Sequence, residues 1–219
     1  MAIRKSKLAT GDIHHVFSKS IMGFIVFNAA SDFQRIRDLC GYYSVEKPYA
    51  KFSSYLKLKD KDNFFKKYFK DNKLLVKIIA YCIMPTHIHL ILKQENDQGI
   101  SVFMNNILNG YTRYFNEKIR RKGPLWESRF KNVKVSTDEQ LLHLTRYLHL
   151  NPNTAKLVES PEEWPYSSYR EYLGKVEPDE RICRQQDLID IGIPEYRRFV
   201  NSNKDYQRQL AQIKHLMLG

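Results

Sequence analysis

Two histidines stand two residues apart in the apolar run Tyr81-Cys82-Ile83-Met84-Pro85-Thr86-His87-Ile88-His89-Leu90-Ile91-Leu92. Side chains alternate between the two faces of an extended strand, so His87 and His89 point to the same side. The side chains between and after them point to the opposite side, into a core: Ile88, Leu90 and Leu92. Two imidazoles on an apolar strand are costly to place unless they bind something, and a divalent metal is the obvious ligand. The pattern therefore predicts a metal site at His87 and His89.

The surrounding residues predict two paired strands. Leu74 to Met84 and His87 to Lys93 are both apolar, and only Pro85-Thr86 separates them. A connection this short requires a tight turn, so the two strands are expected to be antiparallel neighbours.

Further elements follow on both sides of this hairpin. Before the hairpin, one or two strands are expected in Ile13 to Phe27, followed by a helix that Ser31 or Asp32 caps and Gly41 ends. After the hairpin, a long amphipathic helix is expected at Ile100 to Arg120 and a short strand at Phe130 to Val135. A last helix is expected from Glu139 to about Leu150, with Asn151-Pro152 as its end. Tyr42 to Leu58 is irregular, and Asp60 to Asn72 has the pattern of an amphipathic helix.

This order approximates β-α-β-β-α-β. It predicts an α+β fold with a ferredoxin-like antiparallel sheet, helices on one face and an open opposite face. A change in composition at Gly174 to Glu180 divides the chain into a domain at residues 1–175 and a basic, mostly helical C-terminal extension at residues 176–219.

Charge indicates the class of partner. The chain has 219 residues and a formal net charge of +12, and its cations gather in Lys57 to Lys73 and Arg113 to Lys134 with Tyr, Phe and Trp between them. Cations neutralise phosphates and aromatic rings stack on unpaired bases, which favours nucleic acid over a basic surface that serves solubility alone. The 3 cysteines form no CxxC pair, and no signal peptide or membrane span is recognisable. These features predict a reducing, cytoplasmic and nucleoid-associated protein.

The helix expected after Glu139 offers the remaining parts of a site. His143, Tyr147 and Asn151 follow one another at four-residue spacing and so share one helical side. The Tyr147 phenol is a candidate nucleophile, and the Asn151 amide oxygen is a candidate ligand for a hard cation. Spacing alone leaves alternatives open: Tyr111 and Tyr114 are equal candidates, Asn151 suits a helix end, and surface or strand positions suit the other histidines, namely His14, His15 and His143.

Five blocks of sequence, in order, resemble the REP-associated tyrosine transposases, which are relatives of the single-tyrosine HUH transposases of small insertion sequences. The resemblance covers about Ile13 to Gly174. The blocks are Tyr81-Cys82-Ile83-Met84-Pro85-Thr86-His87-Ile88-His89-Leu90, Tyr111-Thr112-Arg113-Tyr114-Phe115-Asn116, Gly123-Pro124-Leu125-Trp126-Glu127-Ser128-Arg129-Phe130, Arg146-Tyr147-Leu148-His149-Leu150-Asn151-Pro152 and Trp164-Pro165-Tyr166-Ser167-Ser168-Tyr169. Two positions differ from the family: Thr86 stands where Asn is usual, and His14-His15-Val16-Phe17-Ser18-Lys19 lacks the family's Asn-Arg.

The resemblance implies roles for individual residues. It makes His87 and His89 the ligands of Mg²⁺ or Mn²⁺, with Asn151 aiding them, and Tyr147 the catalytic nucleophile that forms a 5′-phosphotyrosine link to DNA. The implied substrate is single-stranded DNA with a hairpin, in a transposition reaction that a monomer or a homodimer carries out. Five basic or aromatic residues are expected to contact the hairpin: Arg113, Lys122, Trp126, Arg129 and Lys131.

Two alternatives to this function remain open from the sequence. One is a non-catalytic hairpin-binding protein, which would bind nucleic acid with a steep salt dependence and break no strand. The other is a metal-dependent nuclease that uses water in place of tyrosine and forms no protein–DNA link.

Overall fold

The computed structural model describes residues 7–46, 51–59, 72–186 and 188–202. Its strands are β1 (Ile13–Lys19), β2 (Val76–Met84), β3 (His87–Gln94) and β4 (Lys131–Val135). Its helices are α1 (Ala30–Tyr42), α2 (Phe52–Tyr55), α4 (Gly99–Lys118), α5 (Asp138–Thr154), α6 (Tyr169–Tyr172) and α7 (Ile193–Asn201), with short 3-10 helices η1 (Ile21–Gly23) and η2 (Pro161–Glu163). The helix predicted at residues 60–72 lies outside the described residues, except for residue 72.

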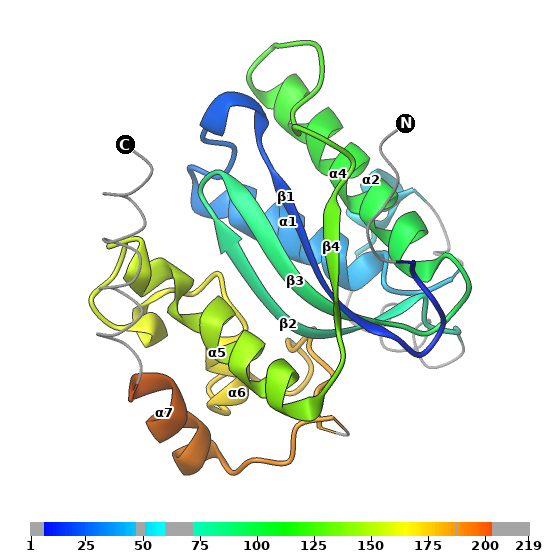
Figure 1. Ribbon diagram of the computed structural model, residues 1–219. Coiled ribbons are helices and arrows are strands. Elements are labelled where there is room, and N and C mark those ends of the chain that lie inside the picture. Colours follow the sequence, from blue (N-terminus) through cyan, green and yellow to red (C-terminus); the bar gives the residue numbers. More distant parts are fainter. Residues whose placement is uncertain (1–6, 47–50, 60–71, 187, 203–219) are drawn as a thin grey trace.

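The four strands form one antiparallel sheet in the order β2-β3-β1-β4 (Figure 1). This is the strand order of a ferredoxin-like fold, so the predicted fold class is confirmed. The predicted hairpin is confirmed as well, because β2 and β3 pair directly and the Pro85-Thr86 turn joins them.

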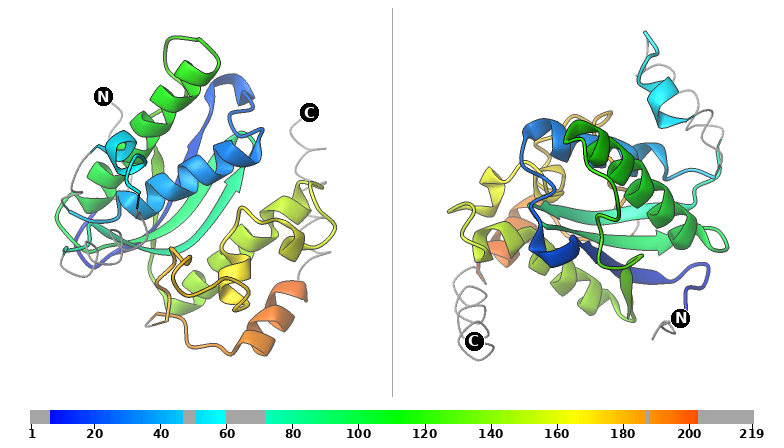
Figure 2. Two further views of the ribbon diagram at one scale, coloured as in Figure 1. Left: turned by 180° about the vertical axis from the view of Figure 1, so that it is seen from behind. Right: turned by 90° about the horizontal axis from the view of Figure 1, so that it is seen from above.

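Helices cover both faces of the sheet, so the prediction of helices on one face and an open opposite face was wrong in that respect. Figure 2 shows α1 and α4 on one side and α5 on the other. The first face builds a core from strand residues such as Ile88 and Leu90 and from helix residues such as Phe103 and Ile107. The opposite face packs a second core against α5, so it is open only in part. Helix α5 covers this second face because its apolar side must be buried against another element.

A β-bulge in β2 adjusts that second face. The pairing with β3 shifts between Ile78 and Ala80, so Ile79 and Ala80 both face α5. Beyond the bulge the alternation of faces is reversed, as an extra residue in one strand requires. Cys82 and Met84 consequently lie on the face of their register partners, His89 and His87.

Two predicted helix ends were wrong. Helix α1 continues through Gly41, and α5 continues through Pro152 to Thr154. Proline removes one backbone donor from a helix. Here the last turn is still closed, because the Ala155 N–H donates to the Asn151 carbonyl over 2.9 Å and both Pro152 and Asn153 are buried.

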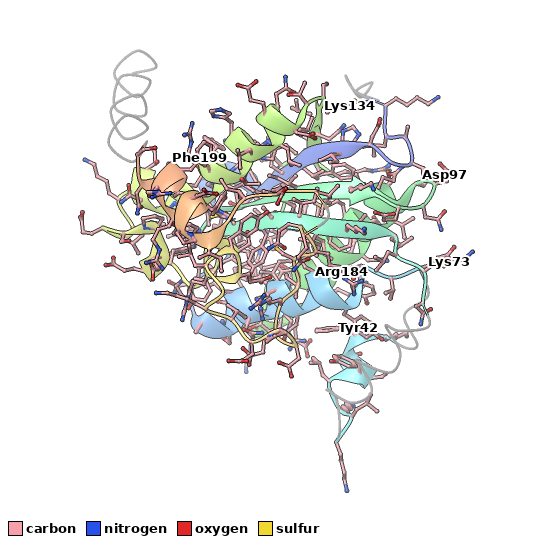
Figure 3. The ribbon with its side chains drawn as sticks, turned by 90° about the horizontal axis from the view of Figure 1, so that it is seen from below. Tyr42, Lys73, Asp97, Lys134, Arg184 and Phe199 are labelled. Carbon is pink, nitrogen blue, oxygen red and sulfur yellow. The ribbon has the colours of Figure 1, made fainter. Side chains whose placement is uncertain are left out.

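The C-terminal segment packs onto the second face. Tyr196 of α7 is buried, and its hydroxyl lies 2.7 Å from His149 Nδ1 and 3.0 Å from Thr145 Oγ1, both on α5. The ring centre of Phe199, a residue labelled in Figure 3, lies 4.1 Å from the guanidinium carbon of Arg146. The helical character predicted for the extension is present in α7, while the domain boundary stays a prediction. In the described ranges, every helix is too short or too polar to cross a membrane.

Candidate active site

His87 and His89 lie on the α5 side of the sheet, as the alternation of β3 predicts. Their ring centres are 4.9 Å apart and the ring planes are almost perpendicular, at 89°. His89 is buried, and His87 is partly exposed at the start of the strand. The Thr86 hydroxyl lies 2.9 Å from His87 Nδ1 and fixes the orientation of that ring.

His15, predicted only as a strand residue, is a third member of this group. Its Nε2 atom lies 2.9 Å from His89 Nδ1, and the two rings stack with their centres 5.1 Å apart. The contact arises because β1 pairs with β3, which brings His15 opposite Ile91 and Phe17 opposite His89. Alternation along β1 could have placed His15 on a sheet face, but only the pairing shows that this face is shared with His89.

Tyr147 approaches the histidines from α5. Its ring centre lies 6.3 Å from that of His89, with the two planes at 85°, and 44% of the residue is exposed. Partial burial, with a smaller contribution from Cys82, raises the pKa of the phenol above its usual value of 10.0. The structure thus brings Tyr147 to the histidine pair, whereas the rival Tyr111 is fully buried in the first core and donates to the Val26 carbonyl.

All three histidines are neutral at pH 7. Burial lowers the pKa of His15 to about 4 and that of His87 to about 4, with a further contribution to His87 from Lys19. Burial, followed by His87, His15 and Lys19, lowers the pKa of His89 to about 2. A neutral imidazole keeps a lone pair for a metal. Because Nδ1 of both His87 and His89 is engaged, Nε2 is the ligating atom available on each.

The two imidazole nitrogens of His87 and His89 suit a divalent cation, and they would leave its other coordination positions open for further ligands. Within the described ranges, no group of three or more His, Cys, Asp or Glu side chains is placed to hold a metal. A metal on His87 and His89 would therefore need a third donor of another kind, and the buried Asn151 amide, one helical turn after Tyr147 on α5, is the candidate that the sequence named. Its Nδ2 atom has no hydrogen-bond partner, and the oxygen and nitrogen of an amide are assigned from their surroundings.

The predicted DNA-contacting residues occupy different places. Lys131 opens β4 opposite Phe17, which places it on the face that carries His15 and His89. Trp126 and Arg129 line a cavity of about 430 Å³ beside α4, where the Trp126 Nε1–H donates to Thr112 Oγ1 over 3.1 Å. Arg113 lines a separate cavity of about 690 Å³ that α1, α2 and α4 share, and Lys122 is exposed in the loop after α4.

The chain is similar to known proteins in sequence and in fold. Residues 53–151 match the model of a family described as Transposase IS200 like. A protein of Haemophilus influenzae described as a REP-associated tyrosine transposase is 28% identical over 113 residues, which are 47% of this chain and 64% of that protein. A solved REP-associated tyrosine transposase bound to a REP hairpin superposes with a TM-score of 0.53 at 15% identity, over 88% of this chain and 96% of that one.

The described part of the chain thus combines a four-stranded ferredoxin-like sheet with a histidine pair on β3 and a tyrosine on the facing helix. Residues 53–151, which match the model of the IS200-like transposase family, include His87, His89 and Tyr147. The resemblance to the REP-associated tyrosine transposases is confirmed.

Proposed function

We propose that this protein is a metal-dependent endonuclease and strand transferase for single-stranded DNA, with Tyr147 as its nucleophile. The observation that supports the proposal best is the approach of the half-exposed Tyr147 ring to within 6.3 Å of His89, whose neighbour His87 shares the same face. A phenol beside a pair of neutral imidazoles matches the needs of phosphoryl transfer to tyrosine.

The substrate we infer is DNA that carries a hairpin. The net charge of +12 and the exposed Lys131 on the histidine face favour a polyanion. The solved relative is bound to a REP hairpin, which gives the shape of the ligand to test first. A strand within a relaxed duplex would have to unpair before it could reach Tyr147.

The reaction conserves the phosphodiester energy. The Tyr147 oxygen bonds to phosphorus and its proton passes to solvent, while the bond from phosphorus to the 3′ oxygen breaks and that oxygen takes up a proton. The product is a 5′-phosphotyrosine link with a free 3′ hydroxyl. When a 3′ hydroxyl attacks the phosphorus of this link, a phosphodiester forms, the bond from phosphorus to the Tyr147 oxygen breaks, and that oxygen takes up the proton. No ATP is required.

His87, His89 and Asn151 are the residues that would hold Mg²⁺ or Mn²⁺. Such a cation, when bound, withdraws charge from the oxygens of the scissile phosphate. Orientation is the task of the neighbouring side chains: the Thr86 hydroxyl fixes the His87 ring, and His15 fixes the His89 ring through the 2.9 Å contact to Nδ1.

A denaturing gel tests the proposal. The full chain is incubated with a labelled single strand that carries a palindrome, with Mn²⁺, with Mg²⁺, or with chelator. We expect a denaturant-resistant adduct that requires the metal, that is lost in Tyr147→Phe, and that is also lost when His87→Ala and His89→Ala are combined. Tyr114→Phe is the matched control and should keep the adduct, because this hydroxyl donates to Asp32 on the opposite side of the sheet.

Two results would replace the proposal. Cut DNA without an adduct would identify a nuclease that uses water. Hairpin binding with neither cleavage nor adduct, at every metal concentration, would identify a non-catalytic binding protein.

A further inference from the structure

Three large apolar side chains project into solvent directly after β1. The exposed fraction is 99% for Met22, 47% for Phe24 and 56% for Ile25. We call these three residues the apolar tip. Single exposed apolar residues are ordinary, but three within four positions form a patch of the kind that marks an interaction site.

The backbone holds the tip in a defined and strained shape. Met22 has a φ of 51°, in the left-handed region that disfavours a residue with a side chain, and Gly23 follows with a φ of 65°. The Ser20 hydroxyl donates to the Phe24 carbonyl over 2.5 Å, and the Phe24 N–H donates to the Ile21 carbonyl over 3.0 Å. This conformation turns the Met22 side chain outward, where folding gains nothing from it.

Both ends of the tip are attached to the turn that precedes His87. The Ser20 N–H donates to the Thr86 carbonyl over 2.9 Å, and the N–H groups of Val26 and Phe27 donate to the Pro85 carbonyl over 2.9 and 3.0 Å. Thr86 in turn contacts His87 Nδ1 through its hydroxyl. Figure 1 shows the loop after β1 at the same end of the sheet as the β2–β3 turn. The apolar tip therefore lies at the end of the sheet where β3 begins with His87, and Phe24 leans toward Phe115 of α4. A strand that passes this end of the sheet on its way to His87 would meet the tip.

The charges around the tip favour nucleic acid as the ligand. Lys19, which pairs with His87 in the register of β1 and β3, is exposed just before the tip. The Arg121 guanidinium carbon lies 5.9 Å from the centre of the Phe24 ring. Apolar side chains flanked by cations suit stacked bases flanked by phosphates, and Met, Phe and Ile are residues that proteins insert at base steps.

We infer that the apolar tip stacks against the last base pair at the foot of a DNA hairpin and keeps the strand that leaves it unpaired on its way to His87 and Tyr147. This inference rests on the proposed function, because it assumes that hairpin DNA is the substrate. It assigns the tip a role that is separate from the chemistry: the tip separates the paired stem from the strand to be cut.

A binding experiment in chelator, where no cleavage occurs, tests the inference. The probe is a DNA hairpin with a single-stranded flank whose first unpaired position is 2-aminopurine, and an unstructured strand of the same composition serves for comparison. The variant is Met22→Asn combined with Ile25→Ser, because Asn tolerates the left-handed backbone and Phe24, which packs against Phe115, is left intact. Ile193→Ser is the matched control, since Ile193 is 45% exposed on α7.

We expect the variant to bind the hairpin about tenfold more weakly or worse, from the loss of stacking on the base pair. It should also lose the change in 2-aminopurine fluorescence, while the affinity for the unstructured strand and the properties of the control stay at wild-type values. An unchanged hairpin affinity and fluorescence in the variant would overturn the inference.

Other outcomes separate this inference from the proposed function. If the wild type formed the Tyr147 adduct but the tip variant bound hairpins normally, the inference alone would fail. If the wild type bound hairpins no better than unstructured strands, hairpin recognition would fail for both. If the tip variant instead lost binding to anionic lipid vesicles, the tip would be a membrane contact and the inference would be overturned.

Discussion

The pKa of Tyr147 lies far above the pKa values of His87 and His89, and this difference predicts how the reaction rate depends on pH. The raised pKa of Tyr147 keeps the phenol protonated at neutral pH, so the phenolate fraction increases about tenfold with each pH unit. His87 and His89, with pKa values of about 4 and about 2, stay neutral above pH 5. The rate of adduct formation in single-turnover assays at saturating Mn²⁺ should therefore rise from pH 6 to 8.5. A maximum near pH 6.5 would contradict this expectation.

His15 gives a second prediction about a single side chain. If its contact with His89 Nδ1 holds the ligand ring in place, His15→Ala should weaken Mn²⁺ binding by about 10- to 100-fold. The signal of free Mn²⁺ in electron paramagnetic resonance measures this without any DNA. His15→Gln is the control, because its amide can restore a hydrogen bond and with it part of the affinity. Equal affinity in the wild type and His15→Ala would show that His15 only fills space.

The sequence predicted some site residues and missed others for a physical reason. The common face of His87 and His89 follows from alternation within one strand, so local pattern was sufficient. The contact of His15 with His89 joins residues 74 positions apart and depends on the register between β1 and β3. No local pattern contains that register, and the approach of Tyr147 depends in the same way on how α5 lies across the sheet.

Among the glycines that the structure describes, Gly99 at the start of α4 leaves the least room for a side chain. A Cβ atom at Gly99 would lie 2.2 Å from the Leu75 carbonyl oxygen, which belongs to the backbone. Gly99→Ala should therefore destabilise the protein by about 1–3 kcal/mol, as measured by urea unfolding. Gly110→Ala in the same helix is the control: its Cβ would meet only the flexible Leu39 side chain at 3.2 Å, and the better helix propensity of Ala offsets that contact. Equal losses in both variants would refute the explanation.

The predicted elements were more accurate in type than in extent. The hairpin of β2 and β3 and the long helix α4 lie where apolar periodicity placed them. The end of α5 differed, because buried Pro152 and Asn153 hold one further turn that a rule about proline cannot foresee. The bulge at Ile79 and Ala80 was equally hidden, since both residues are apolar and satisfy either face.

At the scale of the whole molecule, the net charge predicts how salt affects DNA binding. Each lysine that neutralises a phosphate of a single strand adds about 0.7 to the slope of the logarithm of affinity against the logarithm of salt concentration. Lys131→Ala should therefore reduce the slope by about 0.7 in a titration by fluorescence anisotropy. Lys175→Ala should leave the slope unchanged, because Lys175 pairs with Glu162. An unchanged slope for Lys131→Ala would remove this residue from the binding surface.

The arrangement of layers was predictable only in part. The order of strands and helices indicated the sheet and its first helical layer, which α1 and α4 form. The second layer could not be foreseen, because α5 and the buried Tyr196 of α7 meet through tertiary packing of distant segments.

Helix α5 packs on the sheet of its own chain, where Tyr147 approaches His89 and the Tyr196 hydroxyl of α7 contacts His149. An active site formed within one chain determines how the cleavage rate depends on protein concentration. Once DNA is bound, cleavage should be first order in the complex, with a rate constant that does not change when the protein is diluted. A site that borrowed its tyrosine from a second copy would instead slow down on dilution.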